Sequence, residues 1–460
     1  MTEPHRWREE LEGSVADQAE YIIEEFRAAS DGRVELELVP ANRGIGYLYA
    51  RNRLLVRDEY LERVLEILRE LDERGAAPDE PRADAAREPG REQEEPRIQR
   101  VIAGVVLLRL AESEPSVPDA LAEIDRQLGR GAATPDHVLT VSGGEVSGCP
   151  ATEPEQVYYQ TEPYPSVCPD SGGSGVLIYL ADTGLLADAD ASHPWLAGVR
   201  RGDAADLDAL GPADTIRPYT GHGTFVAGVT RCMAPQADII VTNAFAVAGS
   251  TLESDLVPRL AGALGLGVDI FHLTMAAPSR HDLPLIAFEA WLRLLRQYKG
   301  VVCVVAAGNS ASRRPSWPAA FAEVVSVGAL GADWRSRASF SNYGGWVDVY
   351  APGRDLVNAF ATGTYTCYVW PYKPQERKFY GMAKWSGTSF STPVVTGLIA
   401  SRMSRTGENG REAADALLAE ARARAIAGVG AILLPCCAGD GGHREGGRPG
   451  CCCERRSCRC

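Results

Sequence analysis

Short apolar segments separated by helical patterns fill the middle of this chain and constrain its fold more than any other feature. Apolar runs bounded by turn residues are typical of buried strands. They occur at 176–181, 237–241, 269–275, 301–306 and 324–327, with a long helical pattern near 283–298. Buried strands joined by helices predict an α/β fold, in which a mostly parallel sheet is covered on both faces. Ligands of such sheets bind beyond the carboxyl ends of the strands.

Composition limits the partners of the chain. With 460 residues and 45% hydrophobic content, it is long enough for about three domains and a sizeable core. Its formal net charge of -14 argues against nucleic-acid binding and against adhesion to anionic membranes. The polar N-terminus lacks the apolar core of a signal peptide, and no apolar run approaches the roughly 20 residues that span a bilayer. We therefore expect a soluble, cytoplasmic protein without a membrane span.

A small α+β domain is expected at the N-terminus, in residues 1–145. Helical and strand patterns alternate there, at 4–28, 34–38, 47–56, 61–71, 100–110, 117–128 and 137–141. An acidic insert at 75–96 interrupts them and is interpreted as a solvated loop, because it has almost no large apolar side chains. Residues 146–174 are expected to form a linker, and the parallel-sheet domain is expected at 175–435.

The C-terminal tail, residues 436–460, is rich in Gly, Arg and Cys. Adjacent cysteines such as Cys451, Cys452 and Cys453 cannot all meet one tetrahedral zinc ion comfortably. We therefore interpret the segment as a disordered, thiol-rich tail rather than a metal site. The cysteines scattered through the rest of the chain are interpreted as free thiols, because no signal peptide is seen.

Two polar residues stand where a parallel sheet places its ligands. Asp182 directly follows the strand at 176–181, and Gly184 allows the chain a sharp exit. Among the seven histidines, His222 alone is flanked by glycines and followed by an apolar helical run. These small neighbours let an imidazole approach other backbone closely. Each residue also has a plain structural interpretation, since Asp is common in turns and many histidines are structural.

A hydroxyl and an amide complete the set of candidate catalytic residues. Ser389 begins an apolar helical run after Gly387, where free backbone N–H groups favour developing negative charge. Asn309 follows the strand at 301–306 in a small-residue loop, and its amide can donate to an oxyanion without titrating. Taken alone, Ser389 also fits a helix N-cap, and Asn309 also fits an ordinary loop residue.

The order Asp182, His222, Asn309, Ser389, each framed by small residues, resembles the subtilisin-like serine proteases, or subtilases. The resemblance covers about residues 175–405. It extends to shorter segments that subtilases carry in the same order, namely Trp317-Pro318-Ala319, the run from Val324 to Ala329, Phe340-Ser341-Asn342-Tyr343-Gly344 and Ala351-Pro352-Gly353.

The resemblance implies a serine endopeptidase that acts on proteins or peptides. By analogy, Ser389 attacks the scissile carbonyl, His222 takes its proton, and Asp182 holds the tautomer of the imidazole. Asn309 and the Ser389 backbone N–H receive the oxyanion. This chemistry needs a general base, because a hydroxyl is a poor nucleophile until its proton is removed.

The resemblance also implies where substrate binds. Thr274, Met275 and Ala276 lie in a segment that lines the substrate cleft in the family, and Gly308 is assigned to the same cleft. No cofactor is implied, apart from calcium by family resemblance, and the sequence identifies no calcium site.

Three segments depart from the family pattern. Phe225 stands where a His is common, and little effect is expected because an aromatic ring can pack there. Ala276 and Ala277 stand where the family usually has glycines, which implies a shallower pocket or an altered preference. Residues 354–385 are longer than the family norm and rich in aromatic side chains. They form either a rim that contacts substrate or a self-packed surface hairpin.

Two other functions compete with proteolysis. A catalytically idle subtilase fold could serve as a binding module, but such a module has no need of intact Asp182, His222 and Ser389. An α/β-hydrolase esterase is excluded by residue order, because that fold has its Asp and His after the Ser. Here only Asp415 or Asp440 with His443 would follow it.

The N-terminal domain resembles a prosegment. In many subtilases a small α+β prosegment assists folding and lays its C-terminal end in the active-site cleft. The pattern of 100–141 resembles the second half of such a domain, and the Gly-rich stretch 142–175 offers sites for cutting. The absence of a signal and the charged insert argue against a removable prosegment. We therefore expect this domain to pack on the protease in cis and restrain it, with cleavage left open.

Overall fold

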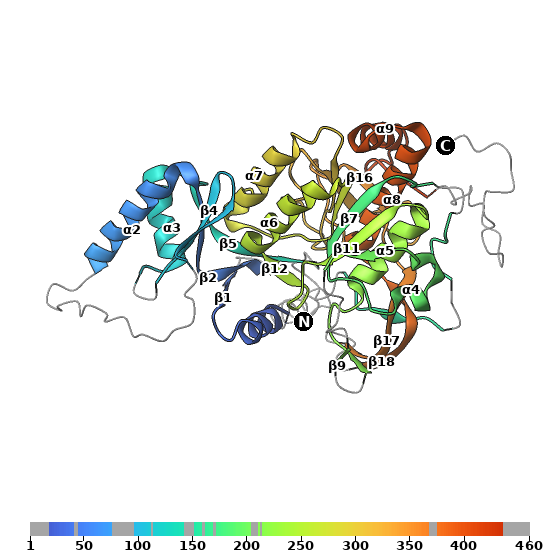
Figure 1. Cartoon of the computed structure of the whole chain (residues 1–460), viewed down its shortest axis with the longest axis horizontal. Coiled ribbons are helices and arrows are strands. Elements are labelled where there is room, and N and C mark those ends of the chain that lie inside the picture. Colours follow the sequence, from blue (N-terminus) through green and yellow to red (C-terminus); the bar gives the residue numbers. More distant parts are fainter. Residues whose placement is uncertain are drawn as a thin grey trace, which may run out of the picture.

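The computed structural model describes residues 18–40, 45–75, 96–111, 114–141, 151–158, 162–168, 172–203, 210–211, 214–367 and 375–435. The main body is built on a seven-stranded sheet in which all neighbouring strands are parallel (Figure 1). Its strands, in spatial order, are β16 (Val349–Pro352), β15 (Val325–Leu330), β14 (Val302–Ala306), β13 (Ile270–Leu273), β7 (Leu177–Asp182), β11 (Asp238–Asn243) and β8 (Arg200–Arg201). The parallel sheet predicted from the apolar runs is confirmed.

Helices cover both faces of this sheet. On β13, His272 hydrogen-bonds Thr396 of α8 at 2.8 Å, whereas the preceding Phe271 packs on Trp291 of α7 with ring centroids 5.3 Å apart. Successive side chains of a strand point to opposite faces, so α8 and α7 lie on opposite sides of the sheet. The helices of the main body are α4 (Ala189–Ser192), α5 (His222–Met233), α6 (Glu253–Ala263), α7 (Ile286–Leu295), α8 (Thr388–Thr406) and α9 (Gly410–Ala423).

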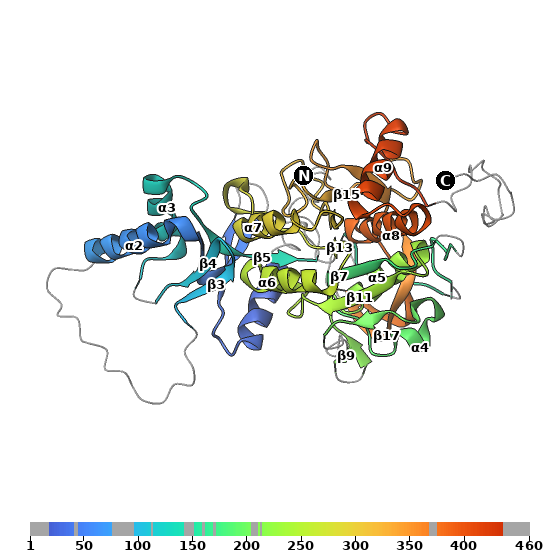
Figure 2. The same ribbon diagram turned by 45° about the horizontal axis from the view of Figure 1, so that its top comes forward.

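A second sheet joins the N-terminal part of the chain to the main body. Its path is β12–β5–β2–β4–β3, and β1 pairs with β2. Because β12 comes from the main body, one continuous sheet connects the two parts. Figure 2 shows β3, β4 and β5 of this sheet beside α6 and α7. The strands are β1 (Leu36–Pro40), β2 (Ile45–Arg57), β3 (Ile98–Ile102), β4 (Val105–Arg109), β5 (Ala133–Thr140) and β12 (Ser250–Leu252).

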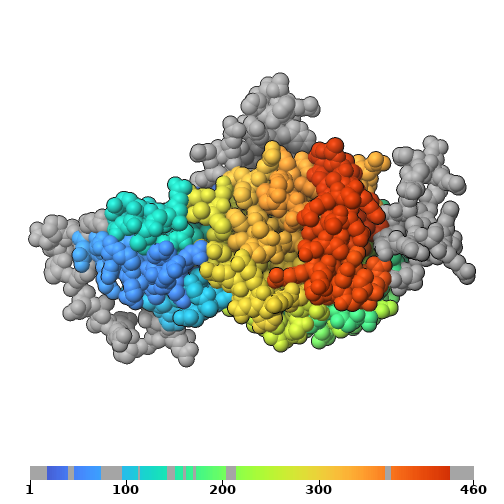
Figure 3. Space-filling model, turned by 90° about the horizontal axis from the view of Figure 1, so that it is seen from above, coloured from blue at the N-terminus to red at the C-terminus, as the bar shows by residue number. Residues whose placement is uncertain are grey.

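The two faces of this second sheet pack on different partners. Leu108 on β4 belongs to a separate core shared with α2 (Leu61–Gly75) and α3 (Val117–Leu128), whereas the adjacent Leu107 belongs to the core of the main body. Helices α6 and α7 both contact β3. The N-terminal residues consequently lie directly against the main body, as the boundary between cyan and yellow in Figure 3 shows.

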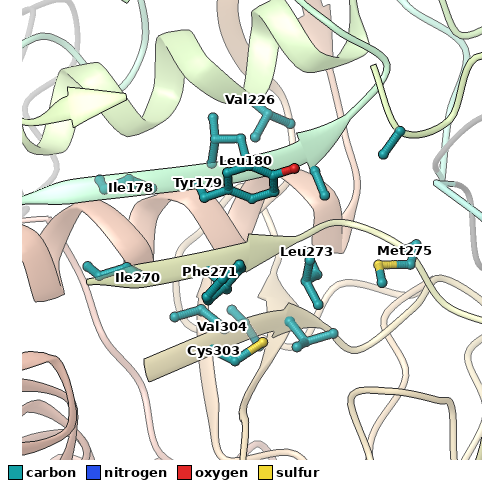
Figure 4. Close-up of a cluster of buried hydrophobic side chains, with 14 of the residues drawn as sticks. Ile178, Tyr179, Leu180, Val226, Ile270, Phe271, Leu273, Met275, Cys303 and Val304 are labelled. Atoms are coloured by element: carbon teal, nitrogen blue, oxygen red, sulfur yellow. The ribbon is translucent and has the colours of Figure 1, made fainter. Parts of the chain in front are cut away.

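The core of the main body lies between the parallel sheet and its helices. Figure 4 shows its centre, where Leu180 of β7 lies near Val226 of α5, while Leu273 of β13 points to the opposite face of the sheet. Full burial of one such aliphatic side chain contributes about 1.5–3 kcal/mol. This packing fixes the strand ends, and with them the polar residues that follow each strand.

A long hairpin forms a third sheet. Strands β17 (Leu356–Cys367) and β18 (Gln375–Trp385) pair antiparallel, and Tyr365, Phe379 and Trp385 are at most 2% exposed. The described part of the aromatic segment therefore fits the self-packed hairpin better than the substrate rim. The sheet also includes β6 (Glu155–Gln156), β9 (Leu210–Gly211) and β10 (Thr215–Ile216). Strand β6 falls within the stretch that was expected to be a linker.

Two local predictions were wrong. The single strand expected at 100–110 is the hairpin of β3 and β4, because Gly104 takes a φ of 93° and turns the chain between them. The sequence Ser250-Thr251-Leu252-Glu253 has the form of a capping box and predicts that a helix begins at Ser250. In the structure α6 instead has Leu252 as its N-cap, with no side-chain hydrogen bond. Residues 250–252 instead pair with β5, and this long-range pairing overrides the local cap pattern.

Some predictions concern segments outside the described residues. The helix expected at 4–28 is described only from residue 18, most of the acidic insert is not described, and the tail at 436–460 is not described. Among the residues that are described, no helix is both long and apolar enough to cross a bilayer.

Candidate active site

Asp182 and His222 meet at the carboxyl end of the parallel sheet. Asp182 is the last residue of β7, and His222 is the first residue of α5. The Nδ1 atom of His222 lies 2.7 Å from Oδ1 of Asp182, and both side chains are fully buried. Glycines allow this approach, because Gly221 takes a φ of 76° and a Cβ on Gly223 would come within 2.3 Å of the Gly184 carbonyl oxygen.

Two further donors hold the carboxylate of Asp182. The Thr183 backbone N–H donates to it at 2.7 Å, and the Thr274 hydroxyl donates at 2.6 Å. Burial alone would raise the pKa of Asp182, but the interaction with His222 and these hydrogen bonds outweigh burial and hold the pKa below its usual value. An ionised Asp182 accepts from Nδ1–H of His222 and so directs Nε2 toward the site. Within the described chain, that Nε2 has no hydrogen-bond partner.

Ser389 lies in the first turn of α8 and is fully buried. Its hydroxyl donates a hydrogen bond to the carbonyl oxygen of Val141 at 3.2 Å. The ring of the next residue, Phe390, lies 5.3 Å from the imidazole ring of His222. The start of α8 is therefore next to His222, while the serine hydroxyl is turned toward a segment of the N-terminal sheet.

Asn309 adjoins the start of α8. Its side-chain oxygen accepts from the Thr388 backbone N–H at 2.8 Å and from the Thr388 hydroxyl at 2.9 Å. These bonds fix the orientation of the amide, because its oxygen faces Thr388 and its amino group forms the opposite, donating end. Gly308, with a φ of 98°, donates its N–H to the same hydroxyl at 3.1 Å. The loop after β14 is thus attached to the residue that precedes Ser389.

An extended segment of the N-terminal sheet crosses this site. Thr140 exchanges two backbone hydrogen bonds with Ala276, at 3.3 and 3.1 Å, and the Val141 N–H donates to the Gly249 carbonyl at 3.0 Å. The Val141–Gly249 bond and the pairing of Thr140 with Ser250 of β12 lie on the other edge of the segment, opposite Ala276. Residues 139–141 are therefore inserted as a strand between two segments of the main body and lead to Ser389.

The residues predicted to bind substrate have different positions. Ala276 pairs with the inserted strand, Thr274 donates to Asp182, Met275 is fully buried, and Gly308 bonds Thr388. The sequence did not predict β12, which pairs with the other edge of the inserted strand. Its three residues are too short for strand periodicity, and they match a helix-cap pattern.

Aromatic rings surround the imidazole of His222. The Trp385 ring centroid lies 5.6 Å from that of His222, and Phe225 packs on Phe390 at 4.5 Å. Phe225 is fully buried, so the aromatic ring at this position does pack. Such surroundings exclude water and strengthen the electrostatic interactions of the site.

No group of three or more His, Cys, Asp or Glu residues that could hold a metal occurs in the described segments. His272 is buried near the candidate active site but hydrogen-bonds Thr396, and burial lowers its pKa to about 3, which favours the neutral imidazole. Among the described cysteines, Cys232, Cys303 and Cys367 are buried free thiols.

Comparison with known proteins identifies the class. The model of the subtilase family matches residues 173–431, which is more than half of the chain. The chain therefore belongs to the subtilase family of serine proteases, as the order of its motifs predicted. The thermophilic serine proteinase of Bacillus sp. (strain AK1) is 33% identical over 272 residues, which cover 56% of this chain and 59% of that protein. Subtilisin Savinase of Lederbergia lenta is 30% identical over 243 residues, covering 50% of this chain and 76% of that protein.

Further relatives cover a similar part. The intracellular serine protease of Paenibacillus polymyxa is 30% identical over 251 residues, covering 51% of this chain and 69% of that protein. Among solved structures, a cold-adapted subtilisin-like serine proteinase is similar with a TM-score of 0.44 and 23% identity, covering 57% of this chain and 89% of that one. This chain thus matches only 59% of the length of the Bacillus sp. (strain AK1) proteinase. The match to the family model begins at residue 173 of this chain.

Proposed function

We propose that this protein is a serine endopeptidase of proteins or peptides, with Asp182, His222 and Ser389 as its catalytic residues. The observation that carries the proposal is the pairing of a buried Asp182–His222 couple with a serine hydroxyl that reaches the carbonyl of an extended chain. Peptide bonds are the substrate of such a site, because the flanking backbone of residues 249–252 and Ala276 pairs with an extended polypeptide.

In the proposed reaction, Oγ of Ser389 bonds to the scissile carbonyl carbon while its proton passes to Nε2 of His222. Asp182 fixes the tautomer of the imidazole and stabilises its protonated form. His222 then gives the proton to the leaving amine, the C–N bond breaks, and an acyl-enzyme remains. Water loses a proton to His222 and attacks the ester, which releases the new carboxyl end and restores the Ser389 hydroxyl.

Asn309 is proposed as the oxyanion donor, together with the backbone N–H of Ser389. The two hydrogen bonds from Thr388 support this role, because they engage the oxygen of the amide and so fix which end of it is the donating amino group. A donor that is fixed before the reaction stabilises the transition state without a cost of reorientation.

The N-terminal domain is proposed to inhibit the protease in cis by filling the cleft. Ion pairs and hydrogen bonds support a specific contact: Arg280 pairs with Asp125 at 2.8 Å, and Arg57 pairs with Glu289 at 2.5 Å. Asp136 accepts from the backbone N–H and hydroxyl of Ser254, at 3.0 and 2.7 Å, at the start of α6. These polar groups fix the register with which β5 enters the cleft.

A binding module without catalysis is the competing function, and a fluorophosphonate probe separates the two. The probe should label Ser389 in wild-type protein once the N-terminal domain has been removed from the cleft, and should not label Ser389→Ala. An uncut, folded chain should react more slowly, because Val141 blocks the hydroxyl. If the freed wild-type protein takes no label and cleaves no peptide, the binding module replaces the endopeptidase as the conclusion.

A further inference from the structure

The chain begins, within its described part, with a helix of residues 18–29 that lies outside the strand–helix pattern of the N-terminal sheet. We refer to it as the N-terminal helix. In Figure 1 it is the dark-blue helix below β1 and β12. It precedes β1, so it is covalently part of the N-terminal domain. Its partners, however, include residues of the main body.

One face of the N-terminal helix is apolar. Ala19, Ile22 and Phe26 are buried, whereas Glu20 and Glu24 are exposed. The spacing of the buried residues is that of one face of an α-helix. An amphipathic helix of this length needs a packing partner, because short isolated helices are marginal in water.

The apolar face joins a cluster that contains residues from both parts of the molecule. Leu48 and Val138 come from the N-terminal sheet, and Leu252 comes from β12 of the main body. Val247 and Ala248, in the loop before β12, pack against the same cluster. The helix is thus shared between the domain that carries it and the edge of the cleft.

A polar contact reaches still closer to the catalytic residues. The side-chain amide of Gln18 donates a hydrogen bond to the hydroxyl of Tyr219, and both residues are buried. Tyr219 precedes His222 by three positions, and its carbonyl oxygen accepts the His222 backbone N–H at 3.2 Å. Its ring also packs over Gly249, where a Cβ would lie 2.6 Å away.

We infer that Tyr219, Val247, Ala248 and Leu252 form a docking surface for an amphipathic helix beside the cleft, and that the N-terminal helix occupies it to retain the N-terminal domain after the chain is cut. We name these four residues the rim surface. The inference rests on the proposed function, in which the N-terminal domain inhibits the protease. It adds a second site of attachment to the cleft itself.

The two attachments differ in what can compete with them. In the cleft, the inhibitor uses backbone hydrogen bonds that any extended substrate can make. The rim surface is bound by side chains, and Val138 faces this helix while the next residue, Leu139, belongs to the core of the main body. A peptide substrate therefore displaces the cleft segment without displacing the helix. Two linked contacts hold a fragment much longer than either contact alone.

The test measures how fast the N-terminal fragment leaves after a defined cut. A recognition sequence for a specific endoprotease is placed within residues 142–150 of the full chain, which carries Ser389→Ala and a C-terminal affinity tag. After cutting on an affinity matrix, the amount of retained N-terminal fragment is followed by mass spectrometry. The wild-type helix is compared with Ile22→Asp, with Gln18→Ala and with Glu24→Lys, the control on the exposed face.

Ile22→Asp should release the fragment at least about tenfold faster, since it buries a charge in an apolar cluster. Gln18→Ala should release it about two- to tenfold faster, and Tyr219→Phe should give no further increase when combined with it, since both remove the same hydrogen bond. Glu24→Lys should release it at the wild-type rate. Circular dichroism of the uncut proteins checks that each variant is folded, and Gln18→Ala keeps the test decisive if Ile22→Asp unfolds.

A parallel series with Ser389 intact distinguishes the two proposals by fluorophosphonate labelling. If the wild-type fragment stays bound and yet labelling is fast, the inhibitory function is wrong. If the fragment stays bound and blocks labelling, but Gln18→Ala and folded Ile22→Asp both release it at the wild-type rate, the inhibition stands and the rim surface is overturned.

Discussion

The hydroxyl of Ser389 donates a hydrogen bond to the carbonyl oxygen of Val141, a residue 248 positions earlier in the chain. This contact places the end of the N-terminal sheet at the proposed nucleophile. It also explains why Nε2 of His222 lacks a partner in the described chain, since the serine proton points toward Val141 instead. The end of the N-terminal sheet thus lies at the position that the proposed mechanism gives to a substrate.

Self-cleavage is expected close to Val141. Purified wild-type protein should yield a large fragment that begins at residue 142, 143 or 144, because these residues follow directly on the contact with Ser389. Ser389→Ala should stay intact. Intact-mass spectrometry of both proteins makes the measurement. A wild-type fragment that begins only beyond residue 151 would mean that the cut is made by another molecule or in another arrangement.

Replacing Thr274 with Val should impair catalysis while preserving the fold. The change removes a 2.6 Å hydrogen bond to Asp182, which helps to hold the pKa of that carboxyl below its usual value. Hydrogen bonds to charged groups contribute about 1.5–3 kcal/mol, so kcat/KM should fall roughly tenfold to a hundredfold. The acid limb of the pH–rate profile should move to higher pH, because the pKa of Asp182 rises when this hydrogen bond is lost. Thr274→Ser restores the hydroxyl and should restore activity; equal losses in both variants would show that Thr274 matters only for packing.

Asn309→Ala should lower kcat by about 10²–10³, the usual effect of losing an oxyanion donor, with little change in KM. The reason is that its amide acts on charge present only in the transition state. Steady-state kinetics on a short peptide substrate measures both constants. A variant with unchanged kcat would remove Asn309 from the site, and a variant with raised KM alone would make it a substrate-binding residue.

Retention of the N-terminal domain should weaken as the pH rises. Burial raises the pKa of Asp136 to about 7 in the docked state, although Arg53 lies 3.9 Å away and Ser254 donates to it; Asp255 on α6 adds to the rise. Docking therefore favours the protonated form. Protonation of Asp136 stabilises the docked state fully below the ordinary pKa of an Asp. This stabilisation is lost as the pH increases through about 7, and the affinity of the N-terminal fragment falls by up to about tenfold per pH unit.

The release assay with cut, inactive protein measures this dependence between pH 5 and pH 8. Asp136→Asn should release its fragment at a rate that changes much less with pH. His137, whose Nδ1 lies 3.7 Å from Glu253, is unchanged in both proteins, so the difference between them isolates Asp136. Parallel pH profiles for the two proteins would contradict the prediction.

The hairpin of β17 and β18 should stabilise the fold through its buried aromatic side chains. Phe379 is 1% exposed and packs on Phe360, whereas the next residue, Tyr380, is 70% exposed. Phe379→Ala should lower the free energy of unfolding by about 3–5 kcal/mol, and Tyr380→Ala should leave it nearly unchanged. Urea denaturation measures both variants. A stable Phe379→Ala protein with altered peptide selectivity would instead support a substrate rim.

Much of the fold and of the site could be predicted from the sequence, because the signals are local. Buried strands such as Leu177–Asp182 are continuous apolar runs, and a strand that ends in an Asp places that Asp at the sheet edge by geometry alone. The glycines around His222 are required by close backbone approach, and this requirement is also visible in the sequence.

Only the tertiary structure shows that residues 139–141 pair with both β12 and Ala276. The pairing of Thr140 with both Ser250 and Ala276 uses backbone N–H and C=O groups, which every residue but proline possesses, so no side-chain pattern announces it. The strand at Ser250–Leu252 is likewise not visible in the sequence, because these residues match a helix-cap pattern and form a strand only through pairing with β5. The periodic spacing of buried side chains along a strand or helix can be read from a sequence. The register between two distant strands is set only when those parts of the chain pair in the folded protein. The sequence of this protein therefore determined its parallel sheet and the residues of its candidate site, and its three-dimensional packing determined that residues 139–141 lie between β12 and Ala276, at the hydroxyl of Ser389.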